Sequence, residues 1–255
     1  MGKIIAIANQ KGGVGKTTTS INLGACLAYI GKSVLLIDLD PQWNCTKGIG
    51  FDPAFCKTTI YNVLVSSCSI EEAIIHTTIK NLDLVSGNLG MAGFDIETYN
   101  VETRHLLLKQ ALQPIINKYD FVLLDCPPSL GMITMNALVT SNSVLIPMLC
   151  EVFSQQGIAQ LLNTILKVQK NFNEKLGIEG ILLTMCDLRT KIGLNIQKEI
   201  RNTFKNKVYA TVVPRDIKLQ EAAAIGKSIV EYSMKSRAFK AYLEISKEVI
   251  KRGRR

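Results

Sequence analysis

Apolar runs of strand length alternate along the chain with segments in which apolar residues recur at helical spacing. The apolar runs predict strands over residues 3–9, 33–39, 82–86, 120–125, 143–149, 179–186 and 208–213. Apolar residues three or four positions apart predict helices over residues 16–30, 58–76, 103–118, 132–141, 154–174, 192–206, 216–226 and 236–252. The alternation predicts an α/β fold, a doubly wound and mostly parallel sheet with helices on both faces.

Nothing in this pattern separates one part of the chain from another. The 255 residues contain no low-complexity linker and no internal repeat, and this length suits one α/β domain with a sizeable core. The longest apolar runs fall far short of the roughly 20 residues that a membrane helix needs. The first predicted strand begins at residue 3, which leaves no room for a signal peptide. We expect a single domain over residues 1–255, located in the cytoplasm.

A glycine-rich segment links the first predicted strand to the first predicted helix. Residues 8–19 read Ala-Asn-Gln-Lys-Gly-Gly-Val-Gly-Lys-Thr-Thr-Thr. A strand, a glycine loop and a helix in this order form the context of a phosphate-binding loop. The glycines allow a tight turn whose N–H groups face an anion, and the helix that begins near Lys16 adds its positive dipole end. Lys16 is placed to reach the β- and γ-phosphates and Thr17 to ligate Mg²⁺, so the segment predicts a nucleotide site.

The loop departs from the ordinary G-x-x-x-x-G-K-[ST] motif. That motif would place a glycine at position 10, where the chain has Gln10, and the loop carries instead a second lysine, Lys11. In reading K-G-G-V-G-K-T-T it resembles the deviant P-loop ATPases, which include ParA/Soj partition proteins, MinD, the arsenite-pump ATPase and the nitrogenase iron protein. The resemblance implies the P-loop NTPase fold.

Carboxylates close two of the predicted strands. One strand runs into Asp38-Leu39-Asp40-Pro41-Gln42 and another into Asp125-Cys126-Pro127-Pro128-Ser129. Ligands of open α/β sheets bind beyond the carboxyl ends of the strands, and a buried carboxylate needs a cation or hydrogen-bond donors. Asp125 fits a Walker B role, in which it holds Mg²⁺ through a water. For Asp38, a strand-end cap or a salt bridge is the competing interpretation.

The D-x-D-P-Q and D-C-P-P-S strings narrow the resemblance to the ParA/Soj–MinD branch. It extends over essentially the whole chain, including E-G-I-L-L-T-M at 179–185 and V-V-P-R at 212–215. It implies that Asp40 positions or activates the attacking water and that Asp38 supports Mg²⁺ coordination.

The same resemblance implies a homodimer in the ATP state. Lys11 would cross the dimer interface to the partner's nucleotide, like an arginine finger, which contributes about 10³–10⁵ in rate. Thr18 would contact the α-phosphate, and Met185, Asp187 and Pro214 would lie around the base. The residues assigned in this way are Lys11, Lys16 and Asp40 for catalysis; Lys11, Gly12, Gly13, Val14, Gly15, Lys16, Thr17, Thr18, Met185 and Pro214 for ATP; and Thr17, Asp38 and Asp125 for Mg²⁺.

Basic residues gather near the C-terminal end of the sequence. The net charge is +9, and residues 235–255 contain eight lysines and arginines against two glutamates, a local net charge of +6. Such a cluster indicates a phosphate-bearing partner, nucleic acid or anionic lipid. A solvated helix end with a basic tail would show the same composition.

Within this branch, the surface to which the protein binds could therefore be DNA or a membrane; we call this surface the platform. ParA/Soj proteins bind double-stranded DNA nonspecifically and respond to a ParB-type protein, whereas MinD-type proteins bind membrane through a C-terminal amphipathic helix and position cell division. Arg189 and Lys218 resemble the basic positions of Soj-like chains. The predicted DNA-binding residues are Arg189, Lys218, Lys235, Arg237, Lys240 and Lys247, with Lys251 and Arg252 as further members of a basic stripe.

The apolar face of segment 236–252 decides our preference between the platforms. It comprises Phe239, Tyr242, Leu243, Val249 and Ile250, and we expect it to pack on the domain rather than on a membrane. We therefore expect a nucleoid-associated partition ATPase with slow, partner-stimulated hydrolysis. A membrane-associated ATPase of the MinD kind is the alternative.

Two stretches depart from the ParA/Soj pattern. Trp43 follows D-P-Q where a glycine is usual, which places a large ring beside the nucleotide pocket or the dimer face. Residues 219–227 read L-Q-E-A-A-A-I-G-K and lack the serine, proline and histidine of the common L-S-E-A-P-S-H-G-K string. We expect these changes to affect nucleotide exchange, partner response and DNA affinity rather than ATP chemistry. A partner-specific surface would lie in residues 58–76 and 87–103.

Other functional classes have less support from the sequence. The seven cysteines are widely spaced and include no C-x-x-C pair, which speaks against a disulfide framework or a zinc ribbon. An iron–sulfur reductase would need more cluster ligands than Cys126, and a metabolic ligase or kinase would need a second substrate pocket. A scaffold that does not hydrolyse ATP would not need Lys16, Thr17, Asp40 and Asp125 together.

Overall fold

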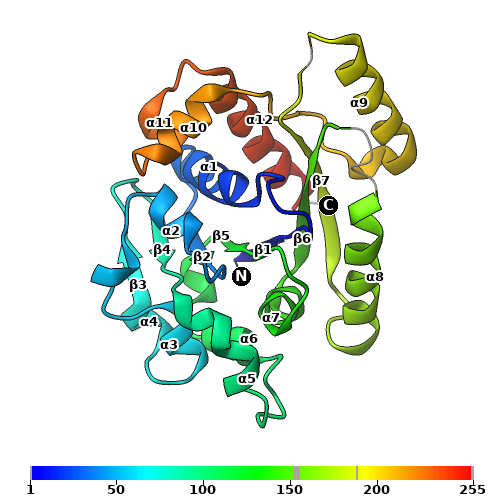
Figure 1. The fold of residues 1–255 in the computed structure, drawn as a ribbon. Helices are drawn as coiled ribbons and strands as arrows, with labels where there is room; N and C mark the ends of the chain where they lie inside the picture. Colours follow the sequence, from blue (N-terminus) through cyan, green and yellow to red (C-terminus); the bar gives the residue numbers. More distant parts are fainter. Residues whose placement is uncertain (1, 152–155, 188, 254–255) are drawn as a thin grey trace.

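Seven strands form one sheet in the computed structural model, which describes residues 2–151, 156–187 and 189–253 (Figure 1). The spatial order is β3-β4-β2-β5-β1-β6-β7. The strands are β1 (Lys3–Ile7), β2 (Val34–Asp38), β3 (Ile74–His76), β4 (Leu82–Val85), β5 (Phe121–Asp125), β6 (Ser143–Leu149) and β7 (Gly177–Thr184). All neighbouring strands are parallel except β3, which runs antiparallel to β4. The predicted doubly wound, mostly parallel sheet is confirmed.

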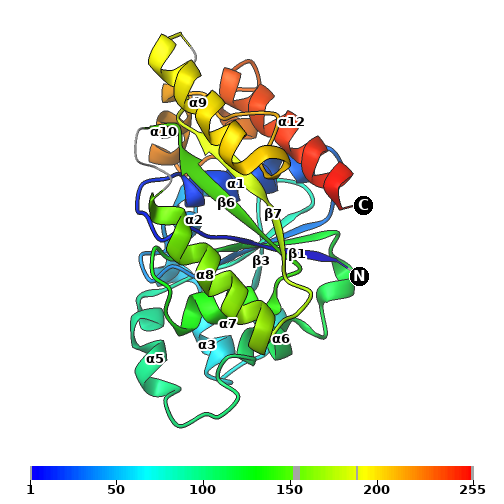
Figure 2. The ribbon, with the colours of Figure 1, turned by 90° about the vertical axis from the view of Figure 1, so that its right-hand side faces the viewer.

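Helices cover both faces of this sheet. They are α1 (Lys16–Tyr29), α2 (Asn44–Gly48), α3 (Ile60–Leu64), α4 (Ile70–Ala73), α5 (Phe94–Glu97), α6 (Leu107–Leu112), α7 (Met132–Thr140), α8 (Gln156–Asn171), α9 (Lys191–Phe204), α10 (Ile217–Ala224), α11 (Ile229–Tyr232) and α12 (Arg237–Arg252). Helices α1, α11 and α12 lie over one face, and α3, α6, α7 and α8 over the other (Figures 1 and 2).

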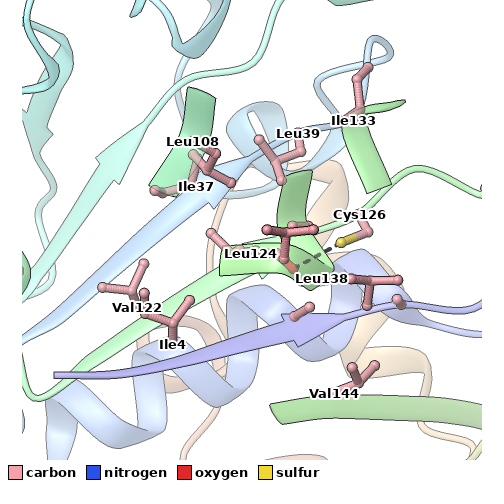
Figure 3. Packing of buried hydrophobic residues seen from close by; sticks show 14 of the residues in the cluster. Ile4, Ile37, Leu39, Leu108, Val122, Leu124, Cys126, Ile133, Leu138 and Val144 are labelled. Carbon is pink, nitrogen blue, oxygen red and sulfur yellow. Dashed lines mark hydrogen bonds between the residues drawn. The ribbon is translucent and has the colours of Figure 1, made fainter. Parts of the chain in front are cut away.

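Successive side chains of the central strands enter opposite core layers. Ile4 of β1 and Val122 of β5 belong to the layer under α6 and α7, which Figure 3 shows from close by. Ile5 of β1 and Leu123 of β5 belong to the layer under α1 and α12. Because both layers need apolar residues, the strands are apolar at nearly every position, as the sequence pattern indicates.

The prediction of one helix over residues 58–76 is wrong. Helix α3 ends before Ser66, which adopts a left-handed φ of +59°. Ser69 then starts α4 with a capping box to Glu72. After this single turn the chain becomes extended, and Ile75 of β3 pairs with Leu84 of β4. The helical spacing therefore spans two short helices and an edge strand.

The predicted strand over residues 208–213 is also wrong. Val208 forms only an isolated bridge with Ile181 of β7. The backbone N–H groups of Ala210 and Thr211 donate to the carboxylate of Glu248 in α12, at 2.9 and 2.8 Å. The N–H groups of Tyr209 and Val213 still donate to Ile181 and Leu183 of β7. Because the two donors between them bind a side chain, no continuous ladder forms and the sheet does not gain an eighth strand. Part of the helix predicted over 154–174 lies outside the described residues, and its remainder is α8.

Helix α12 packs its apolar face on the body of the protein, as the sequence predicts. Phe239, Tyr242 and Val249 are buried in the layer beneath α1, and Leu243 and Ile250 are partly buried against the same layer. The apolar face that a membrane helix would need is thus covered. Within the described ranges, no helix has the length and apolar character needed to cross a membrane.

The C-terminal end of α12 is fixed by Arg252. Its guanidinium donates to the carbonyl oxygens of Glu179 at 2.7 Å and Val208 at 3.2 Å, and it lies 4.2 Å from the ring centroid of Tyr209. The carboxylate of Glu179 in turn accepts from Lys3 Nζ of β1 at 2.6 Å. Arg252 thus has a structural role inside the fold, and its expected place in a DNA-binding stripe stays a prediction.

Substitution of Arg252 by alanine is expected to lower the free energy of unfolding by about 1–3 kcal/mol, because two buried carbonyl groups lose their donor and Tyr209 loses its stacked cation. Denaturant unfolding of both proteins measures the difference. Lys251→Ala is the matched control, since Lys251 is exposed and its side chain has no hydrogen-bond or ion-pair partner within the described part of the chain. Equal losses in the two variants would contradict the anchoring role.

Candidate nucleotide-binding site

The glycine-rich loop turns from β1 into α1 through left-handed backbone. Gly13 and Gly15 have φ values of +72° and +84°, which glycine adopts without the steric cost of a side chain. Gly15 caps α1 without a side-chain hydrogen bond, and the first turn of α1 contains no acidic residue. The N–H groups and the dipole of this helix end are therefore available to an anion.

The loop is also attached to the far side of the sheet. Thr184, the last residue of β7, donates from Oγ1 to the backbone oxygen of Val14 at 2.9 Å. Val14 itself is buried, with 1% of its surface exposed. The position of the loop is thus set by both β1 and β7.

Lys16 lies in the site as the sequence predicts. Its side chain is buried, and Nζ lies 3.5 Å from the backbone oxygen of Lys11. Burial lowers the pKa of Lys16, while the nearby carboxylate of Asp125 opposes this change. Lys11 is exposed, and its backbone N–H donates to Asn9. Its expected role in a partner subunit's site stays a prediction.

Asp125 joins the end of β5 to the first turns of α1. Thr17 Oγ1 donates to Oδ2 of Asp125 at 2.8 Å, and Ser20 Oγ donates to Oδ1 at 2.7 Å. The carboxylate is fully buried. Burial raises the pKa of Asp125 to about 7, the charge of Asp38 adds to the increase, and the hydrogen bonds from Ser20 and Thr17 oppose it. Ser20 was not expected from the sequence, although it lies one helical turn beyond Lys16.

Asp38 lies beside Asp125 on the neighbouring strand, since the two residues are in register. Its Oδ2 accepts from the backbone N–H and the hydroxyl of Thr46, both at 2.8 Å, and its Oδ1 accepts from the N–H of Asp40 at 3.1 Å. Burial raises the pKa of Asp38 to about 6 against these hydrogen bonds. The geometry gives Asp38 the local role of holding α2, and its part in binding Mg²⁺ stays a prediction.

Asp40 begins the turn that leads into α2. It is 9% exposed, and its Oδ1 accepts from the N–H of Gln42 at 2.9 Å. The carbonyl oxygen of Asp40 accepts from the N–H of Trp43 at 2.9 Å. Asp40 lines the main cavity of the site, which is where a residue that orients an attacking water has to lie.

These elements enclose a cavity of about 640 Å³. Its wall on the loop side includes the expected Gly12, Gly13, Gly15, Lys16, Thr17 and Thr18, and its far end includes Met185. Pro214, expected beside the base, instead lines a neighbouring cavity together with Arg189. Pro128, from the loop after β5, also lines the cavity, in agreement with the expectation that Pro127 and Pro128 shape a loop near the γ-phosphate. The residues without a role predicted from the sequence come from α1, α2, α10 and the turns beside them; they are Ile21, Asn22, Gln42, Asn44, Lys47, Gly48, Leu219, Ala223 and Lys227.

A close approach of two glycines fixes the wall opposite the loop. Gly226 has a φ of +64°, and a Cβ atom at this position would lie 2.7 Å from the Cα of Gly50. The segment after α10 can therefore touch the segment after α2, which places Lys227 at the cavity. The glycine in the altered 219–227 string is the signal that could have indicated this contact.

The predicted DNA-binding residues come from several elements of the fold. Arg189, Arg215 and Arg237 line a cavity of about 280 Å³, with Asp187 and Pro214 among its other residues. Arg215 was not singled out from the sequence. Of the remaining candidates, Lys218 lies on α10, Lys240 and Lys247 lie on α12, and Lys235 lies in the turn before α12.

Several of these basic side chains already have partners. Arg189 forms a bidentate pair with Asp187, with two contacts of 2.9 Å, and Lys218 and Lys247 pair with Glu221 and Glu244 within their own helices. Arg237 donates to the carbonyl oxygen of Arg215, whereas Lys235 and Lys240 are exposed. Their contact with DNA stays a prediction.

Comparison with known proteins agrees with this geometry. The family model described as an AAA domain matches residues 2–178. The sporulation initiation inhibitor protein Soj of Bacillus subtilis is 50% identical over 253 residues, which cover 99% of this chain and 100% of Soj. The chromosome partitioning protein ParA of Myxococcus xanthus is 42% identical over 99% of this chain and 89% of its own length.

A solved structure shares the fold over the full chain. It is described as cobyrinic acid a,c-diamide synthase of Mycobacterium smegmatis with bound ADP and magnesium, and has a TM-score of 0.88 with 32% identity, covering 100% of this chain and 96% of that one. A second structure of that protein holds an ATP analogue and magnesium. By its sequence and its fold, this chain belongs to the ParA/Soj family of partition ATPases, within the ParA/MinD superfamily.

Proposed function

We propose that the protein is an ATP-dependent dimerisation switch that binds DNA nonspecifically and hydrolyses ATP during chromosome or plasmid partitioning. The observation that carries the proposal is the contact of Asp125 with Thr17 and Ser20, beside a buried Lys16 and a cavity of nucleotide size. The identity with Soj over the full length supports the biological role.

The residues of the site fit Mg²⁺ together with a nucleotide. In the part of the chain that the structure describes, no three histidine, cysteine, aspartate or glutamate residues could hold a metal ion. Mg²⁺ typically takes only one or two protein ligands and completes its octahedron with phosphate oxygens and water. Thr17 and Asp125 would hold it, and when bound it would supply positive charge against the phosphate oxygens. The buried Asp38 and Asp125 carboxylates against Lys16 leave an excess of negative charge that favours such a cation.

The remaining residues orient the reactants. The N–H groups of the loop and the Lys16 ammonium hold the phosphate oxygens, and Asp40, on the cavity wall, orients the attacking water. Lys11 acts from the partner subunit, where its exposed side chain completes the site. Hydrolysis therefore depends on dimerisation, and a ParB-type protein stimulates it.

The buried face of α12 favours DNA over membrane as the platform. Phe239, Tyr242 and Val249 pack in the core layer under α1, so membrane insertion would require the helix to leave the body. Arg189 is 81% exposed, and it lies at a cavity together with Arg215 and Arg237. Such arginines bind backbone phosphates without reading the base sequence.

Binding to random-sequence duplex DNA tests the function directly, with ATP, ADP or no nucleotide over a salt series. We expect ATP-dependent binding that Lys16→Ala abolishes. Arg189→Ala should keep ATP binding and make the dependence of log affinity on log salt concentration shallower by about 0.9, the contribution of one phosphate contact.

Liposomes containing anionic lipid form the parallel arm of this experiment. ATP-dependent binding to liposomes without binding to DNA would sink the proposed platform and favour a MinD-like role. DNA binding that is indifferent to nucleotide and to Lys16→Ala would overturn the proposed switch.

The stability of the nucleotide-free protein should depend on pH through the buried carboxylates. The pKa of Asp125 is about 7 in the folded protein against an ordinary value of 3.8, so the folded state binds a proton that the unfolded state has released between these pH values. This group therefore adds stability as pH falls from about 7 to about 4. We expect the free energy of unfolding of the wild type, relative to Asp125→Asn, to rise as pH is lowered from 8 to 5, by no more than about 1.4 kcal/mol per pH unit.

Denaturant unfolding in the presence of a chelator measures this difference at each pH. Asp120→Asn is the control, because Asp120 is a half-exposed aspartate paired with Lys32 outside the site. A constant difference between the wild type and Asp125→Asn would show that Asp125 stays ionised throughout the range.

A further inference from the structure

Trp43, the one tryptophan of the sequence, has a backbone conformation that bulky residues seldom adopt. Its φ and ψ are +44° and +33°, in the left-handed region, where glycine carries no steric penalty and large side chains do. A tryptophan at this position therefore carries a steric free-energy cost. This cost raises the question of what the indole ring contributes to the site.

The surrounding structure imposes this conformation. The N–H of Trp43 donates to Asp40, and the carbonyl oxygen of Trp43 accepts from the N–H of Lys47 at 3.1 Å. Helix α2 cannot turn to relieve the strain, because Thr46 is held by Asp38, and a Cβ atom at Gly48 would lie 2.5 Å from Ile21. A left-handed residue at position 43 is thus required whatever its side chain.

The indole ring makes one described contact with a charged group. Lys47 Nζ lies 5.1 Å from the ring centroid of Trp43, within the range of a cation–π interaction. The indole N–H is buried and has no acceptor among the described residues, so no hydrogen bond orients the ring. Lys47 has no ion-pair partner in the described ranges. The ring and the ammonium therefore orient each other.

Lys47 is exposed and lines the nucleotide cavity. The charged residues on the cavity wall are the cations Lys16, Lys47 and Lys227 and the carboxylate Asp40. The wall thus carries an excess of positive charge, and Lys47 contributes to it from α2, a different element from the phosphate-binding loop. A lysine without a counter-ion at this place is suited to an anionic group of whatever fills the cavity.

We propose that Trp43 is a positioning residue for the nucleotide site: its ring holds the Lys47 ammonium at the cavity, where Lys47 contacts a phosphate group of the bound nucleotide. This rests on the proposed function, because it takes the cavity to be the ATP site. The left-handed backbone at position 43 favours glycine, and the chain has tryptophan there. The indole ring fixes the position of the Lys47 ammonium before the nucleotide binds.

A double-mutant cycle with ATP binding measured by calorimetry tests the proposal, using Trp43→Gly, Lys47→Gln and the double variant. Trp43→Gly fits the backbone and removes the ring; we expect it to weaken ATP binding about twofold to fivefold, the range of an exposed cation–π contact. Lys47→Gln should weaken it at least as much. The double variant should bind like Lys47→Gln alone, because the ring acts only through the ammonium. Trp43→Phe, which keeps a ring, should bind more tightly than Trp43→Gly.

Lys227→Gln provides the matched control, since Lys227 is another exposed lysine of the cavity without a described aromatic partner. Its effect should add to that of Trp43→Gly. Tryptophan emission gives a second readout: ATP should change it in the wild type, because a phosphate beside the Lys47 ammonium alters the electric field at the ring that this ammonium contacts, and should change it less in Lys47→Gln.

Two results would overturn the inference. If Trp43→Gly weakens binding equally with and without Lys47, the ring acts on the site by another route. If Lys47→Gln binds ATP like the wild type, Lys47 does not contact the nucleotide. Failure of the proposed function looks different, because the wild type would then bind no ATP, or Lys16→Ala would bind it equally well.

Discussion

The buried carboxylate of Asp125 is the constraint on which the rest of the site depends. It ends the central strand β5 and receives hydrogen bonds from Thr17 and Ser20, so the first turns of α1 have one permitted position over the sheet. Because the phosphate-binding loop precedes α1 directly, the same contacts set the loop. A carboxylate at this depth is costly unless donors or a cation compensate it. The site is thus built around the Asp125 carboxylate, whose burial the hydrogen bonds from Thr17 and Ser20 only partly compensate.

The neighbouring carboxylate uses its charge for a different purpose. Asp38 accepts from Thr46 and Asp40, and it thereby fixes α2 and the turn that carries the proposed water-orienting residue. The two aspartates, in register on adjacent strands, therefore have different structural roles. Asp125 fixes the phosphate-binding loop through α1, and Asp38 fixes α2 on the opposite wall of the cavity. Repulsion between them and their common burial raise both pKa values.

Local patterns in the sequence predicted the fold class, the phosphate-binding loop and the carboxylates at the strand ends. These features depend on residues that are adjacent in the chain, such as the glycines before Lys16. The wrong assignments share another cause. Segment 208–213 has the apolar content of a strand, but the N–H groups of Ala210 and Thr211 in its middle donate to Glu248, which lies some forty residues further along the chain. The spacing of apolar residues in a segment cannot show that a distant side chain accepts hydrogen bonds from the backbone of that segment.

The cavity wall also depends on contacts between distant segments, which sequence patterns do not reveal. Lys227 reaches the cavity because Gly226 touches Gly50. The glycine in the 219–227 string signals a close approach, but the sequence does not say which distant segment it meets. The partners of Arg189 and Lys218 are local and could be proposed from charge patterning, whereas the gathering of Arg189, Arg215 and Arg237 follows from the path of three separate segments.

The anchor of α12 has a consequence for how the chain is assembled. Glu179 of β7 binds Lys3 from the first strand through its carboxylate and Arg252 from the last helix through its backbone oxygen. A ribosome delivers these residues in order, so β1 and α1 emerge long before the helix that covers their apolar side. The emerging chain must keep that side protected while more than two hundred residues are added, and contacts of such long range are intrinsically slow to form. The phosphate-binding loop lies at the junction of β1 and α1. Because α12 packs on these elements and is synthesised last, the loop reaches its final position only when synthesis is nearly complete.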